Sequence, residues 1–296
     1  MKVAVFCYTQ SGQALRVAES ICSGMSCSVV YKTIVPQQSY PFPWTKDEFF
    51  DTFPETRLGL PPSGIEPIDF SDVSDADLVL VVGQSWFLSP SLPLQSFFTD
   101  ERVKEYLAGR DVVFVNACRN MWLMTSRKIK EYLAAAGARM AGHVVLQDNT
   151  PNLVSAFTIV RWLMYGKKDG TRLLPNAGIS EEDISGASRF GEIIESSWND
   201  REWPRLQEKL LKAGAIRYKP SVLFLEKIGH RMFGIWAKFI RRKGEFRDVS
   251  RRFRINLFYY YLLTVLFLIS PFAQLFFCIT YPFHSIERNK KIDCNL

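Results

Sequence analysis

The sequence predicts an α/β protein in which helices cover both faces of a parallel β-sheet. Short apolar runs rich in Val, Leu and Phe recur through the first half of the chain, as expected for parallel strands buried on both faces. Segments with helical spacing of apolar residues lie between these runs, so strands and helices alternate. With 47% hydrophobic and 23% charged residues, the composition excludes both a disordered chain and a multispan transporter.

Five runs of β-forming residues predict the strands, at residues 3–8, 28–35, 78–82, 112–115 and 144–146. Apolar residues at helical spacing predict the helices that join them, at residues 14–25, 94–107 and 129–136. Gly137 directly follows the last of these helices and is expected to be its C-cap. Because strands alternate with helices, we expect a doubly wound sheet of five parallel strands.

The connection between the second and third strands is unusual. Residues 36–69 are rich in Pro and aromatic residues, including a Tyr-Pro-Phe-Pro-Trp run at 40–44. An irregular segment of this length inside a compact domain is more often functional than accidental, so we expect it to contribute to a binding site. The alternative is a hydrophobic patch that covers one edge of the sheet.

The chain becomes helical after the fifth strand, and its character changes again near Tyr218. Residues 152–213 contain amphipathic helical segments, which we assign to the same domain as the sheet. We therefore predict one domain over residues 1–218, with the insertion at 36–69, and a distinct C-terminal region over residues 219–296.

Charge and cysteine content narrow the classes of function. Nine of the 37 basic residues lie at 231–254 with only two of the 30 acidic residues, so the excess of positive charge is local. The six cysteines are scattered, and together with three histidines they form no pattern of metal ligands or disulfides. The N-terminal run 3–6 is too short for the apolar part of a signal peptide, so we expect a cytoplasmic protein with reduced thiols.

The loop after the first strand carries the first chemical signal. In an open α/β sheet, ligands bind outside the carboxyl ends of the strands, where the winding direction reverses. Small hydroxyl residues and a glycine let backbone N–H groups point at an anion, at the N-terminus of the following helix. The loop has neither the Lys of a nucleoside-triphosphate loop nor the GxGxxG pattern of a dinucleotide site. It therefore favours one phosphomonoester over a plain turn, and its residues are Thr9, Gln10, Ser11, Gly12, Gln13 and Ala14.

Two further strand ends are expected at the same edge of the sheet, and each is followed by a tryptophan. Two indoles beside a phosphate loop favour a flat aromatic cofactor held by loop amides, although either tryptophan alone is more often part of the core. The residues expected to contact this cofactor are Ser85, Trp86, Phe87 and Leu88 after the third strand, and Asn116, Ala117, Cys118, Arg119 and Trp122 after the fourth.

These motifs resemble those of flavodoxin-like, FMN-binding domains. Thr9-x-Ser-Gly-x-Ala14 matches their phosphate loop, and Gly83-x-x-Trp86 followed by Pro90 matches the first loop around the isoalloxazine ring. The resemblance implies the strand order 2-1-3-4-5 and FMN as the cofactor. Segments 40–55, 116–122 and 162–168 are similar to a narrower flavoprotein family of dialkylresorcinol and bacterial stilbene biosynthesis. Its members are described as aromatases or dialkylresorcinol-condensing enzymes and work beside a ketosynthase.

The narrower resemblance implies an FMN-dependent oxidoreductase that oxidises an alkylated cyclohexane-1,3-dione to a resorcinol. Asp148 ends the fifth strand at the ligand edge and is the candidate proton acceptor, with a turn or N-cap role as the alternative. Arg119 is the candidate partner of negative charge on the flavin or the dione oxygen, against the alternative of an exposed surface residue. His143 precedes the fifth strand, so we expect it to be structural. The candidate residues of an alkyl-chain pocket are Trp44, Phe49, Phe50 and Trp162.

The C-terminal region predicts membrane association. Residues 255–283 are 29 positions without a charge, whereas about 20 apolar residues suffice to cross a bilayer. The basic residues before this run attract anionic lipid, and interleaved aromatic residues such as Trp236 fit an interfacial helix on the cytoplasmic side. Pro271 divides the run, so a bent anchor competes with one tilted span. The alternatives are a buried helix or the seam of a homodimer, and nucleic-acid binding is not expected because the apolar run has no role in it.

Two other functions stay open on the residues alone. The first is an NAD(P)H-dependent quinone or FMN reductase at the membrane, which would share the same cofactor site. The second is a membrane-tethered flavoprotein carrier or scaffold that positions a ketosynthase without catalysing a reaction. A cyclohexanedione added to the holoprotein separates the three functions, because only the aromatase is expected to reduce its flavin with the dione alone.

Overall fold

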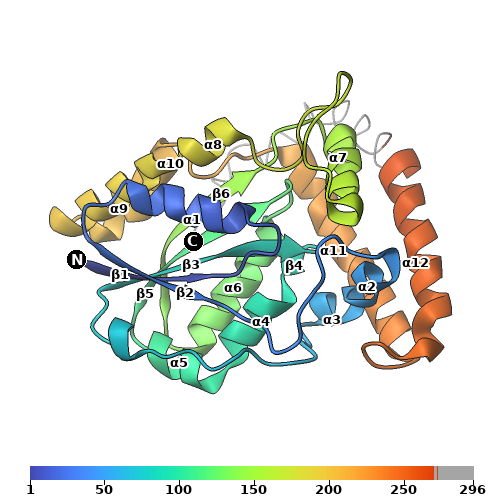
Figure 1. Cartoon of the computed structure of the whole chain (residues 1–296), viewed down its shortest axis with the longest axis horizontal. Coiled ribbons are helices and arrows are strands. Elements are labelled where there is room, and N and C mark those ends of the chain that lie inside the picture. The colour runs from blue at the N-terminus through green and yellow to red at the C-terminus, as the bar shows by residue number, and fades with distance from the viewer. Residues whose placement is uncertain (270–271, 273–296) are drawn as a thin grey trace, which may run out of the picture.

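The computed structural model describes residues 1–269 and 272 of the chain. Its centre is a parallel sheet in the order β2-β1-β3-β5-β6 (Figure 1). This is the doubly wound strand order 2-1-3-4-5 of flavodoxin-like proteins, so the predicted fold class is confirmed. The five strands are β1 (Lys2–Cys7), β2 (Ser28–Thr33), β3 (Leu78–Trp86), β5 (Asp111–Cys118) and β6 (Arg139–Gln147).

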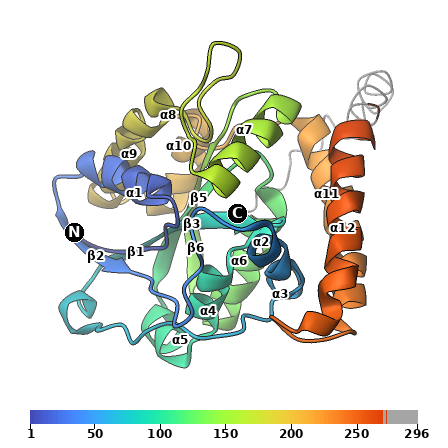
Figure 2. The ribbon, with the colours of Figure 1, turned by 45° about the vertical axis from the view of Figure 1, so that its right-hand side comes forward.

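Helices cover both faces of the sheet (Figures 1 and 2). Along β1, Val3 and Val5 face one layer of helices, whereas Ala4 and Phe6 face the other, and all four are fully buried. Burial on both faces explains why the strands are continuous apolar runs in the sequence. The first layer contains α1 (Gln13–Ser23), α8 (Glu181–Ser185), α9 (Ser188–Asn199) and α10 (Leu206–Lys212), and the second contains α4 (Leu92–Thr99), α5 (Glu101–Leu107) and α6 (Leu123–Ala135).

Three strands are longer than the sequence predicts. β3 continues past Val82 to Trp86, β5 continues past Val115 to Cys118, and β6 begins at Arg139 instead of Val144. Polar and small residues in these extensions interrupt the apolar runs on which the prediction was based. His143 therefore lies inside β6 rather than before it, with its fully buried ring stacked on that of Phe114 at a centroid distance of 5.6 Å.

The end of β3 forms a hairpin that the sequence does not reveal. After Trp86 the chain turns back into β4 (Ser89–Pro90), which pairs with β3 in antiparallel fashion. The two turn residues, Phe87 and Leu88, have φ angles of 46° and 61°. Gly, Asn and Asp usually occupy such left-handed positions, so a Phe-Leu pair does not predict a turn.

The insertion contains two short helices, where irregular structure was expected. They are α2 (Lys46–Asp51) and α3 (Phe53–Leu58). Thr45 begins α2 through a capping box, in which its Oγ1 accepts the N–H of Glu48 at 3.2 Å and the Glu48 carboxylate accepts the N–H of Thr45. The Thr-x-x-Glu spacing of a capping box is present in the sequence, but the prediction did not use it and treated the proline-rich segment as irregular.

The C-terminal helices pack beside the insertion (Figure 2). After β6 come α7 (Asn152–Tyr165), α11 (Pro220–Arg241) and α12 (Arg252–Thr264), which continues into a π-helical turn at Val265–Ile269. Helix α11 contacts α3 and α6, and α12 contacts α2 and α11. The predicted domain boundary near Tyr218 falls between α10 and α11 and stays a prediction, whereas Pro271 lies outside the described residues.

Candidate functional site at the carboxyl edge of the sheet

The carboxyl ends of β1, β3 and β5 bring three predicted loops to one edge of the sheet. Cys7 at the end of β1 pairs with Val82 of β3, and Gly83 pairs with Asn116 of β5. The strand order reverses between β1 and β3, because β2 lies on one side of β1 and the later strands lie on the other. Proteins of this topology bind their ligands at that switch point.

The loop Thr9–Gly12 after β1 has the features of an anion cradle. Gly12 has a φ angle of 82° and caps α1, whose first turn contains no acidic residue. A Cβ atom on Gly12 would meet no other atom within 4 Å, so the space around this corner is open. The Thr9 hydroxyl oxygen is buried without a hydrogen-bond partner in the described part of the chain. An orphaned hydroxyl at the N-terminus of a helix fits a phosphate ester held by neutral donors.

Two side chains of the loop already have partners in the surrounding protein. Gln10 Nε2 donates to the carbonyl oxygen of Pro41 at 2.8 Å, which joins the loop to the insertion. The Gln13 side chain makes two 3.2 Å hydrogen bonds with the main chain of Ile179, and Ala14 is fully buried under the helix. Gln13 and Ala14 can therefore offer a ligand only their main-chain atoms.

Trp86 lies in an aromatic cluster at the same edge. Its half-buried ring is 6.0 Å from that of Tyr8, 5.3 Å from Tyr40 and 5.5 Å from Trp44, each in edge-on geometry. The main-chain N–H of Trp44 donates to Leu163 of α7 at 2.8 Å, and Trp44 Nε1 is buried without a partner among the described residues. We call Tyr8, Tyr40, Trp44 and Trp86 the edge cluster.

Sequence reasoning missed Tyr8 and Tyr40 as site residues. Tyr8 directly precedes the phosphate loop, and Tyr40 opens the Tyr-Pro-Phe-Pro-Trp run. Their positions beside two recognised motifs were the available signal. Burial raises the pKa of both phenols, so both remain protonated at neutral pH.

Phe87 and Leu88 can contact a ligand at the edge only through main-chain atoms, because both side chains pack elsewhere. The Phe87 ring lies 4.7 Å from that of Phe49 and 5.2 Å from that of Phe53, inside the apolar cluster of the insertion. The Leu88 side chain approaches Gly229 of α11. Left-handed φ angles at two non-glycine residues are sterically strained, and such strain is concentrated at functional sites.

Amide side chains at the end of β5 have unused hydrogen-bonding atoms. Asn116 is fully buried, accepts the Ser85 hydroxyl at 3.0 Å and leaves its Nδ2 without a partner in the described structure. Asn120, which the prediction did not include, donates to Asn152 at 2.8 Å and leaves its Oδ1 unpartnered there. One free donor and one free acceptor fit the edge of a heteroaromatic ring, which presents both kinds of atom.

The structure places Trp122 away from the position that the sequence predicts. The indole is buried between the N-terminus of α6 and helix α11, where it packs with Cys118 and Leu223 and lies 5.7 Å from the ring of His143. Among the described residues, Trp122 shares no ring contact with Trp86. The expectation that Trp122 contacts the same cofactor as Trp86 is therefore wrong, because α11 covers this end of β5 and Trp122 packs beneath it.

Three other predicted site residues at the end of β5 lie differently relative to the edge. Burial raises the pKa of the Cys118 thiol, so the side chain is neutral, whereas Ala117 packs on the opposite face of the sheet. Arg119 is half-buried and donates to the carbonyl oxygen of Asn152 at 3.0 Å. Burial lowers the pKa of the Arg119 guanidinium to about 10, which still leaves it charged at neutral pH.

Asp148 lies at the expected edge, but both its oxygens have partners. Oδ1 accepts the N–H of Thr150 at 2.9 Å, and Oδ2 accepts the hydroxyl of Ser155 at 2.6 Å. The carboxylate is also 1% exposed, so it has little access to a ligand. This arrangement is that of a turn residue, which was the alternative to a proton acceptor.

The structure separates the four residues predicted for an alkyl-chain pocket. Trp44 and Phe49 lie together with a centroid distance of 5.7 Å. Trp44 also lines a cavity of about 270 Å³ between the insertion and α12. Phe50 is buried against Phe258 and Tyr259 of α12, so it belongs to the core between the two segments. Trp162 is buried on α7 and contacts the ring of Phe42 instead.

Comparisons with known proteins add context for this topology. No family model and no curated protein matches the chain. Among solved structures, an archaeal flavodoxin is 15% identical, with a TM-score of 0.38, over 67% of this chain and 99% of its own. A WrbA-like flavodoxin from Agrobacterium tumefaciens is 10% identical, with a TM-score of 0.40, over 67% of this chain and 97% of its own. An azoreductase from Bacillus anthracis is 11% identical, with a TM-score of 0.35, over 67% of this chain and 99% of its own. The flavodoxin-like fold itself is assigned from the strand order above.

Proposed function

We propose that the protein is an FMN-dependent oxidoreductase. The supporting observation is the Thr9–Gly12 loop, with its orphaned hydroxyl, beside the edge cluster at the switch point of the sheet. The loop would hold the phosphate, Trp86 would border the ring system, and the free amide atoms of Asn116 and Asn120 would meet its edge. Bound FMN would supply two-electron redox chemistry, while the chain supplies binding, orientation and electrostatics.

The substrate that we propose is an alkylated cyclohexane-1,3-dione supplied by a ketosynthase, and the product is a resorcinol. Similarity of the segments 40–55, 116–122 and 162–168 to the dialkylresorcinol and stilbene flavoproteins supports this choice. The cavity beside Tyr40 and Trp44 offers the alkyl chain aromatic contacts on one side only, because charged residues line much of the rest, namely Asp47, Glu48, Asp51, Arg247, Asp248 and Arg252. Arg119 supplies a positive charge near the edge, where it would stabilise an enolate oxygen. Because Asp148 is occupied, the proton would leave to solvent water.

We further propose that the protein works at the inner face of the cytoplasmic membrane. The helical segment Val249–Ile269 spans 21 residues, and an 18-residue window within it has a mean hydropathy of 1.3 and is 11% buried. Large apolar side chains on it, including Phe253, Tyr260 and Leu268, are more than half exposed. Exposed Lys238, Arg242 and Lys243 precede it and favour anionic lipid. Arg251 was expected among the lipid-facing basic residues, but it is fully buried in ion pairs and cannot contact lipid.

A single anaerobic titration tests the cofactor and the reaction together. The purified protein is expected to be yellow, and an alkylated cyclohexane-1,3-dione is expected to bleach its visible flavin absorbance while a resorcinol forms. Bleaching by NAD(P)H but not by the dione would show a reductase instead, and bleaching by neither would show a carrier or scaffold. A colourless protein that takes up no added FMN would overturn the cofactor assignment.

A further inference from the structure

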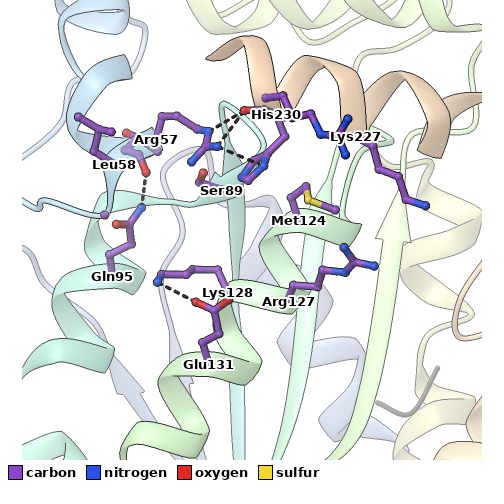
Figure 3. A pocket seen from close by; sticks show the side chains of 13 residues that line it. Arg57, Leu58, Ser89, Gln95, Met124, Arg127, Lys128, Glu131, Lys227 and His230 are labelled. Atoms are coloured by element: carbon purple, nitrogen blue, oxygen red, sulfur yellow. Dashed lines mark hydrogen bonds and ion pairs between the residues drawn. The ribbon is translucent and has the colours of Figure 1, made fainter. Parts of the chain in front are cut away.

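A second cavity, of about 610 Å³, lies between α3, α6 and α11 (Figure 3). Its volume falls within the range of small-molecule binding sites. Neither the Thr9–Gly12 loop nor any residue of the edge cluster lines it, so it is distinct from the proposed cofactor site.

The walls of this cavity are strongly basic. Five cationic side chains line it, whereas Glu131 is its one acidic residue and is paired with Lys128 at 2.9 Å. Within the described chain, no carboxylate forms an ion pair with the other four cations, which are Arg57, Arg127, Lys227 and Arg231. Arg127, Lys227 and Arg231 are exposed, so solvent screens them, and Arg127 also interacts with the buried Glu226 carboxylate. The summed positive potential of the four cations nevertheless favours an anion in the hollow.

Arg57 illustrates how the charge is left uncompensated. Its guanidinium donates to the main-chain carbonyl of His230 at 3.0 and 2.8 Å and lies 3.2 Å from His230 Nδ1. Burial and the neighbouring Arg57 and Arg127 lower the pKa of His230 to about 4, so the imidazole is neutral at pH 7 and can accept this hydrogen bond. The half-buried guanidinium is therefore fixed in place by neutral acceptors alone.

The cations face the cavity from opposite sides. Figure 3 shows Arg57 and His230 on the wall formed by α3 and α11, with Arg127 and Lys128 on the facing wall formed by α6. Arginine presents paired donors that match phosphate oxygens, and lysine adds a point charge. The cavity is larger than one carboxylate requires, and its charge suits a ligand with two or more negative charges.

We propose that this cavity binds a phosphate-bearing ligand, through Arg57, Arg127 and Lys227. The phosphate could belong to a soluble phosphoester or diphosphate, or to the headgroup of a phospholipid that reaches α11 from the membrane surface. Both sources present the same multiply charged phosphate oxygens, so the cavity alone does not distinguish them and the experiment must.

Isothermal titration calorimetry on the full-length protein tests the site with two probes. The probes are inorganic pyrophosphate and a short-chain, water-soluble phosphatidic acid. The variants are Arg127→Gln and Lys227→Gln, because both side chains are exposed and their loss should leave the fold intact. Lys219→Gln is the matched control, since Lys219 is an exposed lysine directly before α11 that neither lines the cavity nor belongs to the proposed lipid-binding residues.

At least one probe is expected to bind the wild-type protein, and each cavity variant is expected to weaken that binding about tenfold, with the control unchanged. Binding of pyrophosphate identifies a soluble ligand, and binding of phosphatidic acid alone identifies a lipid headgroup. Dissociation constants weaker than about 10 mM for both probes would overturn the proposal. Equal binding by wild type and both cavity variants would also overturn it, as would a parallel loss of FMN from those variants, because the two sites would then not be separate.

Discussion

Single residues at the ligand edge matter here chiefly through hydrogen-bonding atoms that have no partner. Buried polar atoms are nearly always paired in folded proteins, so an orphaned atom beside a loop points to a ligand. Thr9 Oγ1 and Asn116 Nδ2 are such atoms within the described structure, and they lie after β1 and in β5, the two strands that flank β3. By contrast, Asp148 has both oxygens occupied and so contributes to the fold of its turn.

The Thr9 hydroxyl gives a prediction in which stability and binding respond differently. Thr9→Val removes a buried hydroxyl that has no partner, so the free energy of unfolding without ligand should stay constant or rise by about 1 kcal/mol. The same change removes a donor to the phosphate, so the dissociation constant of FMN should rise about tenfold. Urea denaturation and flavin-fluorescence titration measure the two effects.

Riboflavin is the control for this variant, because it has the same ring system and no phosphate. Its affinity should be equal in the wild-type protein and in Thr9→Val. Equal loss of riboflavin and FMN binding would show that Thr9 does not contact the phosphate.

Glu226 gives a prediction about pH. Its fully buried carboxylate accepts the N–H of Met124 at 2.8 Å. Burial raises its pKa from 4.5 to about 7, against the lowering effect of hydrogen bonds from the main chain at 122–124 and of the nearby Arg127. Between pH 4.5 and 7 the folded state therefore holds more protons than the unfolded state. The free energy of unfolding should fall across this window as the pH rises, by about 3 kcal/mol.

Glu226→Gln should remove that fall. His143 acts in the opposite direction, because burial lowers its pKa to about 3 and its contribution is lost as the pH falls. Since both proteins contain His143, the difference between their thermal melting curves from pH 4.5 to 8 isolates Glu226. A difference that does not change with pH would contradict the assignment.

At the scale of elements, the two departures from a simple doubly wound domain pack against each other. The insertion and the C-terminal helices share one apolar cluster, in which the rings of Phe53 and Phe258 stack at a centroid distance of 3.7 Å. Arg251 lies beneath this cluster, fully buried, and donates to Asp51 at 2.8 Å and to Glu55 at 2.7 Å. The C-terminal region thereby fixes the insertion that supplies Tyr40 and Trp44 to the edge.

Replacing Arg251 tests this coupling. Arg251→Met leaves the buried Glu55 carboxylate without its closest partner, since Arg241 is 3.6 Å away. We expect the free energy of unfolding to fall by about 3 to 5 kcal/mol, because an unpaired buried charge is strongly destabilising. The measurement is the urea midpoint, together with limited proteolysis of α12.

Two matched variants accompany this test. Arg252→Met alters the adjacent exposed arginine and should change the urea midpoint little. Adding Glu55→Gln to Arg251→Met removes the unpaired charge and should restore part of the stability. If the double variant is no more stable than Arg251→Met, the buried ion pair does not hold the two elements together.

At the scale of the whole molecule, the sheet was predictable from sequence because both of its faces are buried. The strands β1, β3, β5 and β6 each carry a buried apolar run, and the motif at Thr9–Gly12 depends only on local residue types. Trp122 was misplaced because its environment is made by α11, nearly a hundred residues later in the chain. The hairpin at Phe87 and Leu88 was missed because tertiary packing, not residue type, holds its left-handed turn.

If the proposed function is right, the arrangement of the whole molecule gives an apolar substrate a route to the edge. The cavity beside Trp44 is lined on its other side by Ile255 and Asn256 of α12. If the exposed face of α12 lies on a membrane, this cavity opens close to the lipid. Membrane binding and substrate supply would then depend on the same helix.

A triple variant tests the membrane-facing side of α12. Phe253→Ser, Tyr260→Ser and Leu268→Ser replace side chains that are 72%, 64% and 62% exposed, so the folded core should be unaffected. Burial of one such side chain in lipid contributes about 1.5 to 3 kcal/mol, so binding to anionic vesicles should fall at least about a hundredfold. Flotation with vesicles measures the bound fraction.

The matched control carries Leu173→Ser, Tyr165→Ser and Leu60→Ser on the sheet domain. These side chains are 90%, 71% and 48% exposed. Both variants are compared in the full chain and in a chain ending at Ile269, so that the residues beyond Ile269 cannot hide the effect. The control should float with the vesicles as the wild-type protein does, because its substitutions lie outside α12. Equal flotation of the α12 variant and the control in the shorter chain would show that α12 does not contact the bilayer, and the route from lipid to the Trp44 cavity would then have to be abandoned.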